Sequence, residues 1–118
     1  MRASRGEIKI EEILIAAGVN FKEEYSFKDL LSNNGRPLRF DFAIFDDDGD
    51  LDFLIEFQGE QHYVAKSKFG GISGLRKQQY NDMQKRIYCQ KHNITLVEIP
   101  YLDEGRLNYD YIFTAAGY

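Results

Sequence analysis

The sequence has one cysteine and two histidines, and this scarcity excludes several classes of protein. Cys89 alone cannot form a disulfide within the chain, and these three residues are too few ligands for a structural zinc site. No apolar run reaches the roughly 20 residues of a membrane span, and the first residues are polar rather than signal-like. We therefore expect an intracellular protein without a zinc finger, a zinc-bound ββα site or a membrane segment.

The composition indicates one folded domain over residues 1–118. The chain is 43% hydrophobic and 14% aromatic, enough for a modest core. The net charge of −4 conceals a segregation, because residues 41–60 hold eight acids and no lysine or arginine, whereas residues 61–92 hold seven lysines and arginines and one acid. An acidic pocket beside a basic flank suits an enzyme that holds a metal and phosphates in adjacent places. A solvated charged helix is the alternative.

The hydrophobic pattern predicts an α/β fold with a mixed sheet flanked by helices. Apolar residues at helical spacing up to Ala17, followed by Gly18, indicate the first helix. Asp48-Gly49 is typical of a hairpin turn between two apolar strands. The expected elements are helices at 4–17 and 75–92, strands at 19–27, 38–45, 51–57 and 94–99, loops at 32–37 and 58–74, and a final helix near 107–113.

Each strand of this hairpin carries one acid, Asp41 or Glu56. A turn at residues 48 and 49 would place these two acids opposite each other, and neighbouring carboxylates repel unless a cation or a proton lies between them. Oxygen ligands of this kind suit Mg²⁺. Alternatively, Asp41 pairs with a nearby arginine and Glu56 with a lysine. Strand alternation also predicts that Phe40 and Phe42 share the face opposite Asp41.

Polar residues just beyond the second strand could complete a catalytic site. His62 could activate water as a general base, although a lone histidine is more often structural. Gln58 lies one pleat beyond Glu56 and could orient water or a phosphate oxygen. The aspartates at 46–52 do not match the spacing of a calcium loop, so we interpret them as an exposed hairpin tip.

Two acids on the predicted helices have simple structural explanations. Ser4 and Glu7 match a capping box, although Glu7 also lies on the core side of its helix. Asp82 lies three and four residues before Lys85 and Arg86, which indicates a surface ion pair. The two basic residues could equally contact phosphate.

Taken together, these motifs resemble a known group of enzymes. Ser-x-x-Glu in the first helix, Phe-Asp-Phe at 40–42, Ile-Glu-x-x-Gly-x-Gln-His at 55–62, Phe-Gly-Gly at 69–71 and Asn-Asp-x-x-Lys-x-x-Tyr-Cys at 81–89 occur in that order, before an apolar strand. They resemble the catalytic domain of phage-encoded EDxHD homing endonucleases. That group is related to very-short-patch repair endonucleases in the PD-(D/E)XK superfamily. The resemblance extends from Ser4 to about Tyr101 and implies an αβββαβ restriction-endonuclease-like core.

The resemblance also implies roles for individual residues. The glutamate, aspartate, histidine and final aspartate of the group correspond to Glu7, Asp41, His62 and Asp82, and Gln58 lies where the superfamily usually has a lysine. This departure favours His62 as the base. We expect Asp41, helped by Glu56 or a nearby carbonyl, to bind Mg²⁺, for which Mn²⁺ can substitute. The basic residues expected to hold DNA are Lys66, Lys68, Arg76, Lys77, Lys85 and Arg86.

We therefore predict a metal-dependent endonuclease domain that hydrolyses phosphodiester bonds in double-stranded DNA. A homodimer would supply the two sites that a double-strand cut needs. A separate DNA-recognition region is expected outside this chain. If the protein is phage-encoded, it works in the cytoplasm of a bacterial host. The alternatives are a mismatch- or structure-specific repair nicking nuclease and a non-enzymatic DNA-binding module on a nuclease fold.

Overall fold

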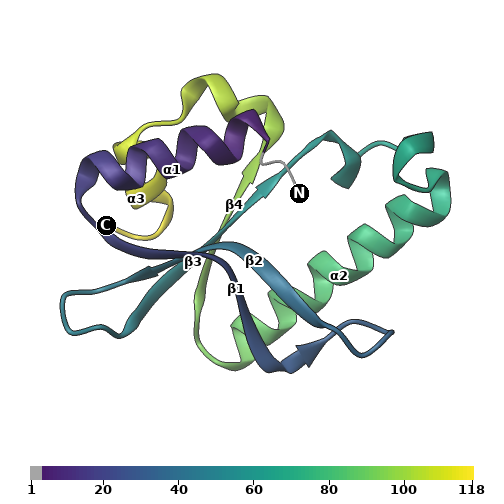
Figure 1. The fold of residues 1–118 in the computed structure, drawn as a ribbon, viewed down its shortest axis with the longest axis horizontal. Coiled ribbons are helices and arrows are strands. Elements are labelled where there is room, and N and C mark those ends of the chain that lie inside the picture. Colours follow the sequence, from purple (N-terminus) through teal and green to yellow (C-terminus); the bar gives the residue numbers. More distant parts are fainter. Residues whose placement is uncertain (1–3) are drawn as a thin grey trace.

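A computed structural model describes residues 4–118 as a four-stranded mixed sheet with helices on both faces (Figure 1). The strand order is β1–β2–β3–β4, in which β1, β2 and β3 are antiparallel and β4 runs parallel to β3. The predicted α/β class and the order helix, three strands, helix, strand are confirmed. The elements are α1 (Arg5–Ala17), β1 (Asn20–Leu31), β2 (Pro37–Phe45), β3 (Leu51–Gln58), α2 (Gly71–Lys91), β4 (Thr95–Pro100) and α3 (Tyr109–Ala115), with short 3₁₀ helices at Glu60–His62, Ser67–Phe69 and Tyr101–Arg106.

Each face of the sheet has its own hydrophobic cluster. On one face, apolar side chains of β2, β3 and β4 pack against α1 and α3. On the other, β2 and β3 pack against Cys89 of α2. The only other buried residues of α2 are Asp82 and Lys85, so this helix approaches the sheet mainly through polar side chains. Within residues 4–118, no helix has the length and apolar content that crossing a bilayer requires.

The β2–β3 hairpin has the register that the sequence indicates. Phe42 pairs with Ile55, Ala43 with Leu54 and Ile44 with Phe53, as expected for a turn at residues 48 and 49. At the tip, Oδ1 of Asp46 accepts hydrogen bonds from the backbone N–H groups of Asp48 and Asp50, both at 3.0 Å. These bonds explain the aspartate run as a turn.

The predicted alternation fails at Asp41. Phe40 packs in the α2 cluster, whereas Phe42 packs in the α1 cluster, so the two rings do not share a face. Pairing between β2 and β3 covers Phe42 to Phe45, whereas pairing between β1 and β2 continues to Pro37. Strands β2 and β3 therefore diverge at Asp41. In Figure 1, β1 and β2 curve away from β3 and β4 on the side where α2 lies.

Most boundaries lie within two residues of the sequence prediction, including those of α3 (Tyr109–Ala115), and two differ by more because tertiary contacts extend the elements. Strand β1 reaches Leu31, where it pairs with Pro37 at the start of β2. Helix α2 begins at Gly71, inside the predicted glycine-rich loop. Gly74 is needed there because a Cβ would lie 1.7 Å from the carbonyl oxygen of Phe69. Glycine has a low helix propensity, and for this reason the sequence pattern predicts a loop where the first turn of α2 lies.

The amino-terminal turn of α1 lies very close to the end of β3. Gly6 is buried against the ring of Phe57, and a Cβ on Gly6 would lie 2.2 Å from Cζ of that ring. Only glycine permits this approach. It brings the following residue, Glu7, to the place where β2 and β3 diverge.

We predict that Gly6→Ala destabilises the protein, because the added methyl group forces apart the ring of Phe57 and the backbone of α1. Overpacking of this kind costs about 1–3 kcal/mol, which lowers the melting temperature by several degrees in a domain of this size. Thermal unfolding followed by circular dichroism measures the effect. Gly105→Ala is the matched control, because no atom lies within 4 Å of its Cβ position. Equal melting temperatures for the two variants would contradict the close approach.

Candidate active site

Asp41 lies at the divergence of β2 and β3. The backbone N–H of Phe57 donates a hydrogen bond of 2.7 Å to Oδ2 of Asp41. The side chain of Asp41 thus takes the place of a backbone acceptor for this N–H group of β3. The bond holds the carboxylate between β2 and β3. Asp41 is half-buried and lies near two further carboxylates, those of Glu7 and Glu56. Its negative charge contributes to the raised pKa of each.

Glu7 caps its helix and also belongs to the acidic group. Its backbone N–H donates to Oγ of Ser4 at 3.2 Å, and the Ser4 hydroxyl donates to Oε1 of Glu7 at 3.0 Å. Burial, together with the negative charge of Asp41, raises the pKa of Glu7 above its ordinary value, although the bonds with Ser4 oppose this shift. The capping prediction is confirmed, and the same side chain lies near Asp41.

Glu56 forms a buried ion pair with Lys85 of α2. The side chains are 7% and 10% exposed, and Nζ of Lys85 also lies 5.4 Å from the centre of the Phe40 ring. Burial raises the pKa of Glu56 well above its ordinary value and Asp41 adds to the rise, while Lys85 opposes it. Pairing with a lysine was the alternative that the sequence left open for Glu56, and the structure contains that pair.

His62 and Asp82 form a second buried pair. Nδ1 of His62 lies 2.8 Å from Oδ2 of Asp82, and Nε2 of Gln78 donates to the other carboxylate oxygen at 3.3 Å. Burial opposes ionisation of Asp82, but the hydrogen bonds and charges of its neighbours outweigh it and lower the pKa of Asp82. An ionised carboxylate only accepts hydrogen bonds, so Nδ1 of His62 carries a proton, and Nε2 is the nitrogen that can accept a proton in the neutral ring.

The structure therefore changes the interpretation of Asp82. A surface ion pair with Lys85 or Arg86 was the simple sequence-based expectation, yet Asp82 is 6% exposed and pairs with His62. Lys85 connects the two groups of residues, because its amine contacts Glu56 and its charge contributes to the lowered pKa of Asp82. Lys85 thus lies near both Glu56 and Asp82.

Gln58 is buried with both ends of its amide engaged. The hydroxyl of Tyr63 donates to Oε1 at 2.6 Å, and Nε2 donates to Oε2 of Glu98 at 3.1 Å. Glu98 in turn accepts two hydrogen bonds from Arg86, at 2.6 and 2.9 Å. These contacts hold Gln58 in a hydrogen-bond network, and each end of its amide keeps one further donor or acceptor site, so its role in orienting water stays a prediction.

A polar pocket of about 270 Å³ opens at this network. His62 and Asp82 line it together with Gln58, Tyr63, Gln79 and Arg86. The pocket gives the histidine ring a polar space into which a substrate can enter.

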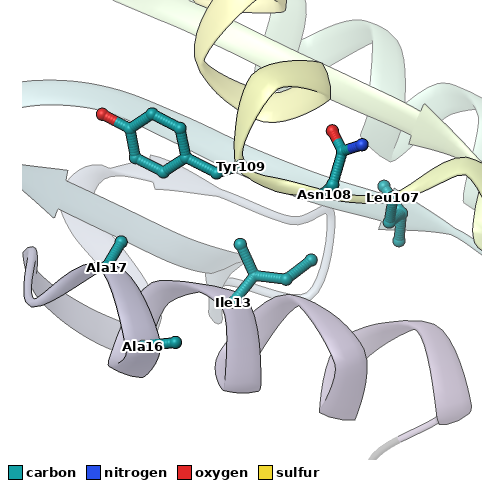
Figure 2. A pocket seen from close by; sticks show the side chains of 6 residues that line it. All are labelled: Ile13, Ala16, Ala17, Leu107, Asn108 and Tyr109. Atoms are coloured by element: carbon teal, nitrogen blue, oxygen red, sulfur yellow. The ribbon is translucent and has the colours of Figure 1, made fainter.

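Figure 2 shows a different, mainly apolar pocket of about 480 Å³. It lies between α1 and the segment that leads into α3, and its lining is Ile13, Ala16, Ala17, Leu107, Asn108 and Tyr109. None of these is a predicted site residue.

The carboxylates fit a divalent cation with oxygen ligands. Glu7, Asp41 and Glu56 are close enough to raise the pKa of Glu7 and of Glu56, and a cation would relieve this repulsion. Mg²⁺ is commonly held by one or two carboxylates, with water completing its shell. Among residues 4–118, three carboxylates whose ligand atoms all lie within 4.8 Å of one another occur only at the exposed hairpin tip, in Asp46, Asp48 and Asp50. Exposed acids of that kind are common without an ion.

The six basic residues predicted to contact DNA fall into two sets. Three are paired with acids: Lys85 is buried against Glu56, Arg86 binds Glu98, and Lys66 contacts Glu60. The others, Lys68, Arg76 and Lys77, are exposed at the start of α2 and just before it. Of these three, Lys77 lines a pocket together with Gln78, the hydrogen-bond partner of Asp82.

Several residues of the site were not identified from the sequence. Gln78 lies one helical turn before Asp82, a spacing that could have indicated a hydrogen bond. Glu98 gave no comparable signal, because its contact with Arg86 depends on where β4 joins the sheet.

Comparisons with known proteins give two partial matches. No family model and no solved structure matches the chain. Uncharacterized protein 094L of Frog virus 3 is 53% identical over 53 residues, which are 43% of this chain and 34% of that protein. Uncharacterized protein 307L of Invertebrate iridescent virus 6 is 42% identical over 48 residues, 40% of this chain and 24% of that protein. The matches thus span about a third and a quarter of these relatives, and they relate part of the chain to viral proteins.

We predict that Asp41→Asn stabilises the protein in metal-free buffer at neutral pH. The carboxylates of Glu7 and Glu56 have raised pKa values, so the folded state keeps protons that the unfolded state has lost, and stability falls as pH rises above about 4.5. Removing the charge of Asp41 removes part of this loss, and the asparagine oxygen can still accept from Phe57. Thermal unfolding in EDTA should show a gain of a few degrees at pH 7.5 that disappears towards pH 4.

Two comparisons test the cause of this gain. Asp47→Asn, at the exposed hairpin tip, should leave the melting temperature unchanged at both pH values. Excess Mg²⁺ should stabilise the wild type and not Asp41→Asn, because only a folded site binds the ion. A wild type that is more stable than Asp41→Asn in EDTA at pH 7.5 would contradict repulsion among the three carboxylates.

Proposed function

We propose that this chain is a Mg²⁺-dependent DNA endonuclease domain that hydrolyses phosphodiester bonds, as expected of the EDxHD homing endonuclease group. The observation that supports it most is the buried His62–Asp82 pair, with Lys85 near both Asp82 and Glu56, an acid that lies close to Asp41. A base with a fixed tautomer and a cation site are the two components that metal-assisted hydrolysis needs.

The residues have distinct tasks in this proposal. Asp41, with Glu56 or a backbone carbonyl, holds the ion, which supplies positive charge to stabilise the phosphate in the transition state. Nε2 of His62 accepts a proton from the attacking water, while Asp82 holds the ring and stabilises its protonated form. Glu7 accepts a hydrogen bond from that water. Water adds to phosphorus, a phosphorus–oxygen ester bond breaks, and the departing oxygen takes up a proton.

The exposed basic residues supply the DNA contact in this proposal. Lys68, Arg76 and Lys77 are exposed, Lys77 lines a pocket together with Gln78, and all three would bind backbone phosphates in a salt-dependent manner. We propose that two copies act together when both strands are cut, and that the domain works on DNA inside an infected cell. Base recognition is assigned to a region outside the chain.

Plasmid cleavage tests the proposed activity. Purified protein should convert supercoiled plasmid to the nicked or linear form with Mg²⁺ or Mn²⁺, and EDTA should stop it. Asp41→Asn and His62→Ala should each lower the rate by about 10²–10⁴-fold, the usual contribution of a cation site or a general base. His92→Ala is the matched control, because the second histidine is exposed and stacks on Tyr88 outside the site.

The products distinguish the alternatives. DNA binding without cleavage in any metal would indicate a non-enzymatic module. Faster nicking of a mismatched than of a matched duplex would indicate a repair nuclease. Cleavage that survives both Asp41→Asn and His62→Ala would place the active site elsewhere.

We predict that Asp82→Asn lowers the cleavage rate by about 10²–10⁴-fold while the protein remains folded. An asparagine can donate to Nδ1 of His62 and so place the proton on Nε2, where it blocks proton acceptance. The ¹⁵N chemical shifts of the His62 ring should show this change of tautomer, and circular dichroism should show an unchanged helix content. Full activity with an altered tautomer would exclude His62 as the base.

A further inference from the structure

Lys85 occupies an unusual position for a lysine. Among the lysines and arginines of residues 4–118, Lys85 is the one that is buried, with 8% of its surface exposed. Its amine contacts Oε1 of Glu56 and lies 5.4 Å from the centre of the Phe40 ring, and Asp41 lies near the same carboxylate. Buried charges require partners, so Lys85 serves as the positive charge of the acidic group.

This pairing creates a competition for Glu56. A divalent ion that binds Asp41 and Glu56 needs the carboxylate oxygens of both, and the Lys85 amine already contacts one oxygen of Glu56. The ion therefore binds Glu56 more readily when the amine has another partner. A lysine ammonium ends a flexible four-carbon stem and is suited to exchange one anion for another.

We propose that Lys85 holds Glu56 until DNA arrives, and that a DNA phosphate then takes over the amine while the divalent ion takes over the carboxylate. This inference rests on the proposed nuclease function and adds a positioning residue to it. Binding of DNA and of the ion becomes cooperative, because each releases the partner that the other needs. Cooperativity of this kind is reciprocal and typically amounts to 5–150-fold in affinity. In the metal-free protein, Lys85 thereby offsets the charge of Glu56 alone.

Calorimetric titration with Ca²⁺ tests this competition without any cleavage assay. Ca²⁺ takes oxygen ligands like those of Mg²⁺, and every protein carries Asp48→Asn to weaken binding at the hairpin tip. In the otherwise wild-type protein, a short DNA duplex should raise the Ca²⁺ affinity by about tenfold. Lys85→Met should bind Ca²⁺ about tenfold more tightly without DNA and gain little more when DNA is added.

Lys91→Met is the matched control, because it removes one positive charge from an exposed position of the same helix outside the proposed DNA contact. It should bind Ca²⁺ as the parent does, with and without DNA. Lys85→Gln can donate to Glu56 without a charge and serves if Lys85→Met does not fold. Identical Ca²⁺ affinities and identical DNA effects in the Lys85 and Lys91 variants would overturn the proposal.

The same titrations separate this inference from the proposed function. If Asp41→Asn abolishes Ca²⁺ binding and plasmid nicking, but the Lys85 and Lys91 variants behave alike, only the role of Lys85 fails. If the wild type neither cuts DNA nor binds Ca²⁺ in a manner that depends on Asp41, the nuclease proposal fails as well.

Discussion

The buried ion pair between Glu56 and Lys85 is the interaction on which the rest of the structure most depends. Helix α2 buries only Asp82, Lys85 and Cys89, so apolar packing alone does little to hold it against the sheet. Removing one partner of a buried pair costs about 3–5 kcal/mol, because the other charge remains without compensation. The pair therefore attaches α2, and with α2 in place Asp82 reaches His62. The same contact thus connects α2 to β3 and offsets the charge of Glu56.

A second constraint is the divergence of β2 and β3 at Asp41. Where the strands separate, the backbone N–H of Phe57 bonds to a side chain, and the ring of Phe57 packs on Gly6. One residue of β3 thus positions both Asp41 and the helix turn that carries Glu7. Like charges gathered in this way destabilise the metal-free protein, and such local cost is typical of functional sites.

The sequence predicted the architecture better than the contacts. The hairpin register followed from the Asp48-Gly49 turn, because a turn and a period of two determine which residues face each other. The prediction that Phe40 and Phe42 share a face was wrong. Alternation assumes an unbroken strand pair, and β2 leaves β3 at Asp41. The start of α2 was also misplaced, because Gly74 is selected by close packing against Phe69 and not by helix propensity.

The sequence by itself determined the elements, the turn, the cap of the first helix and the segregation of acidic from basic residues, because these depend on neighbours along the chain. Only the tertiary structure decided which partner each charged side chain takes. It paired Lys85 with Glu56, Asp82 with His62, and Gln58 with Tyr63 and Glu98. Such partners come from distant segments, and their choice depends on burial, which only the packed fold establishes.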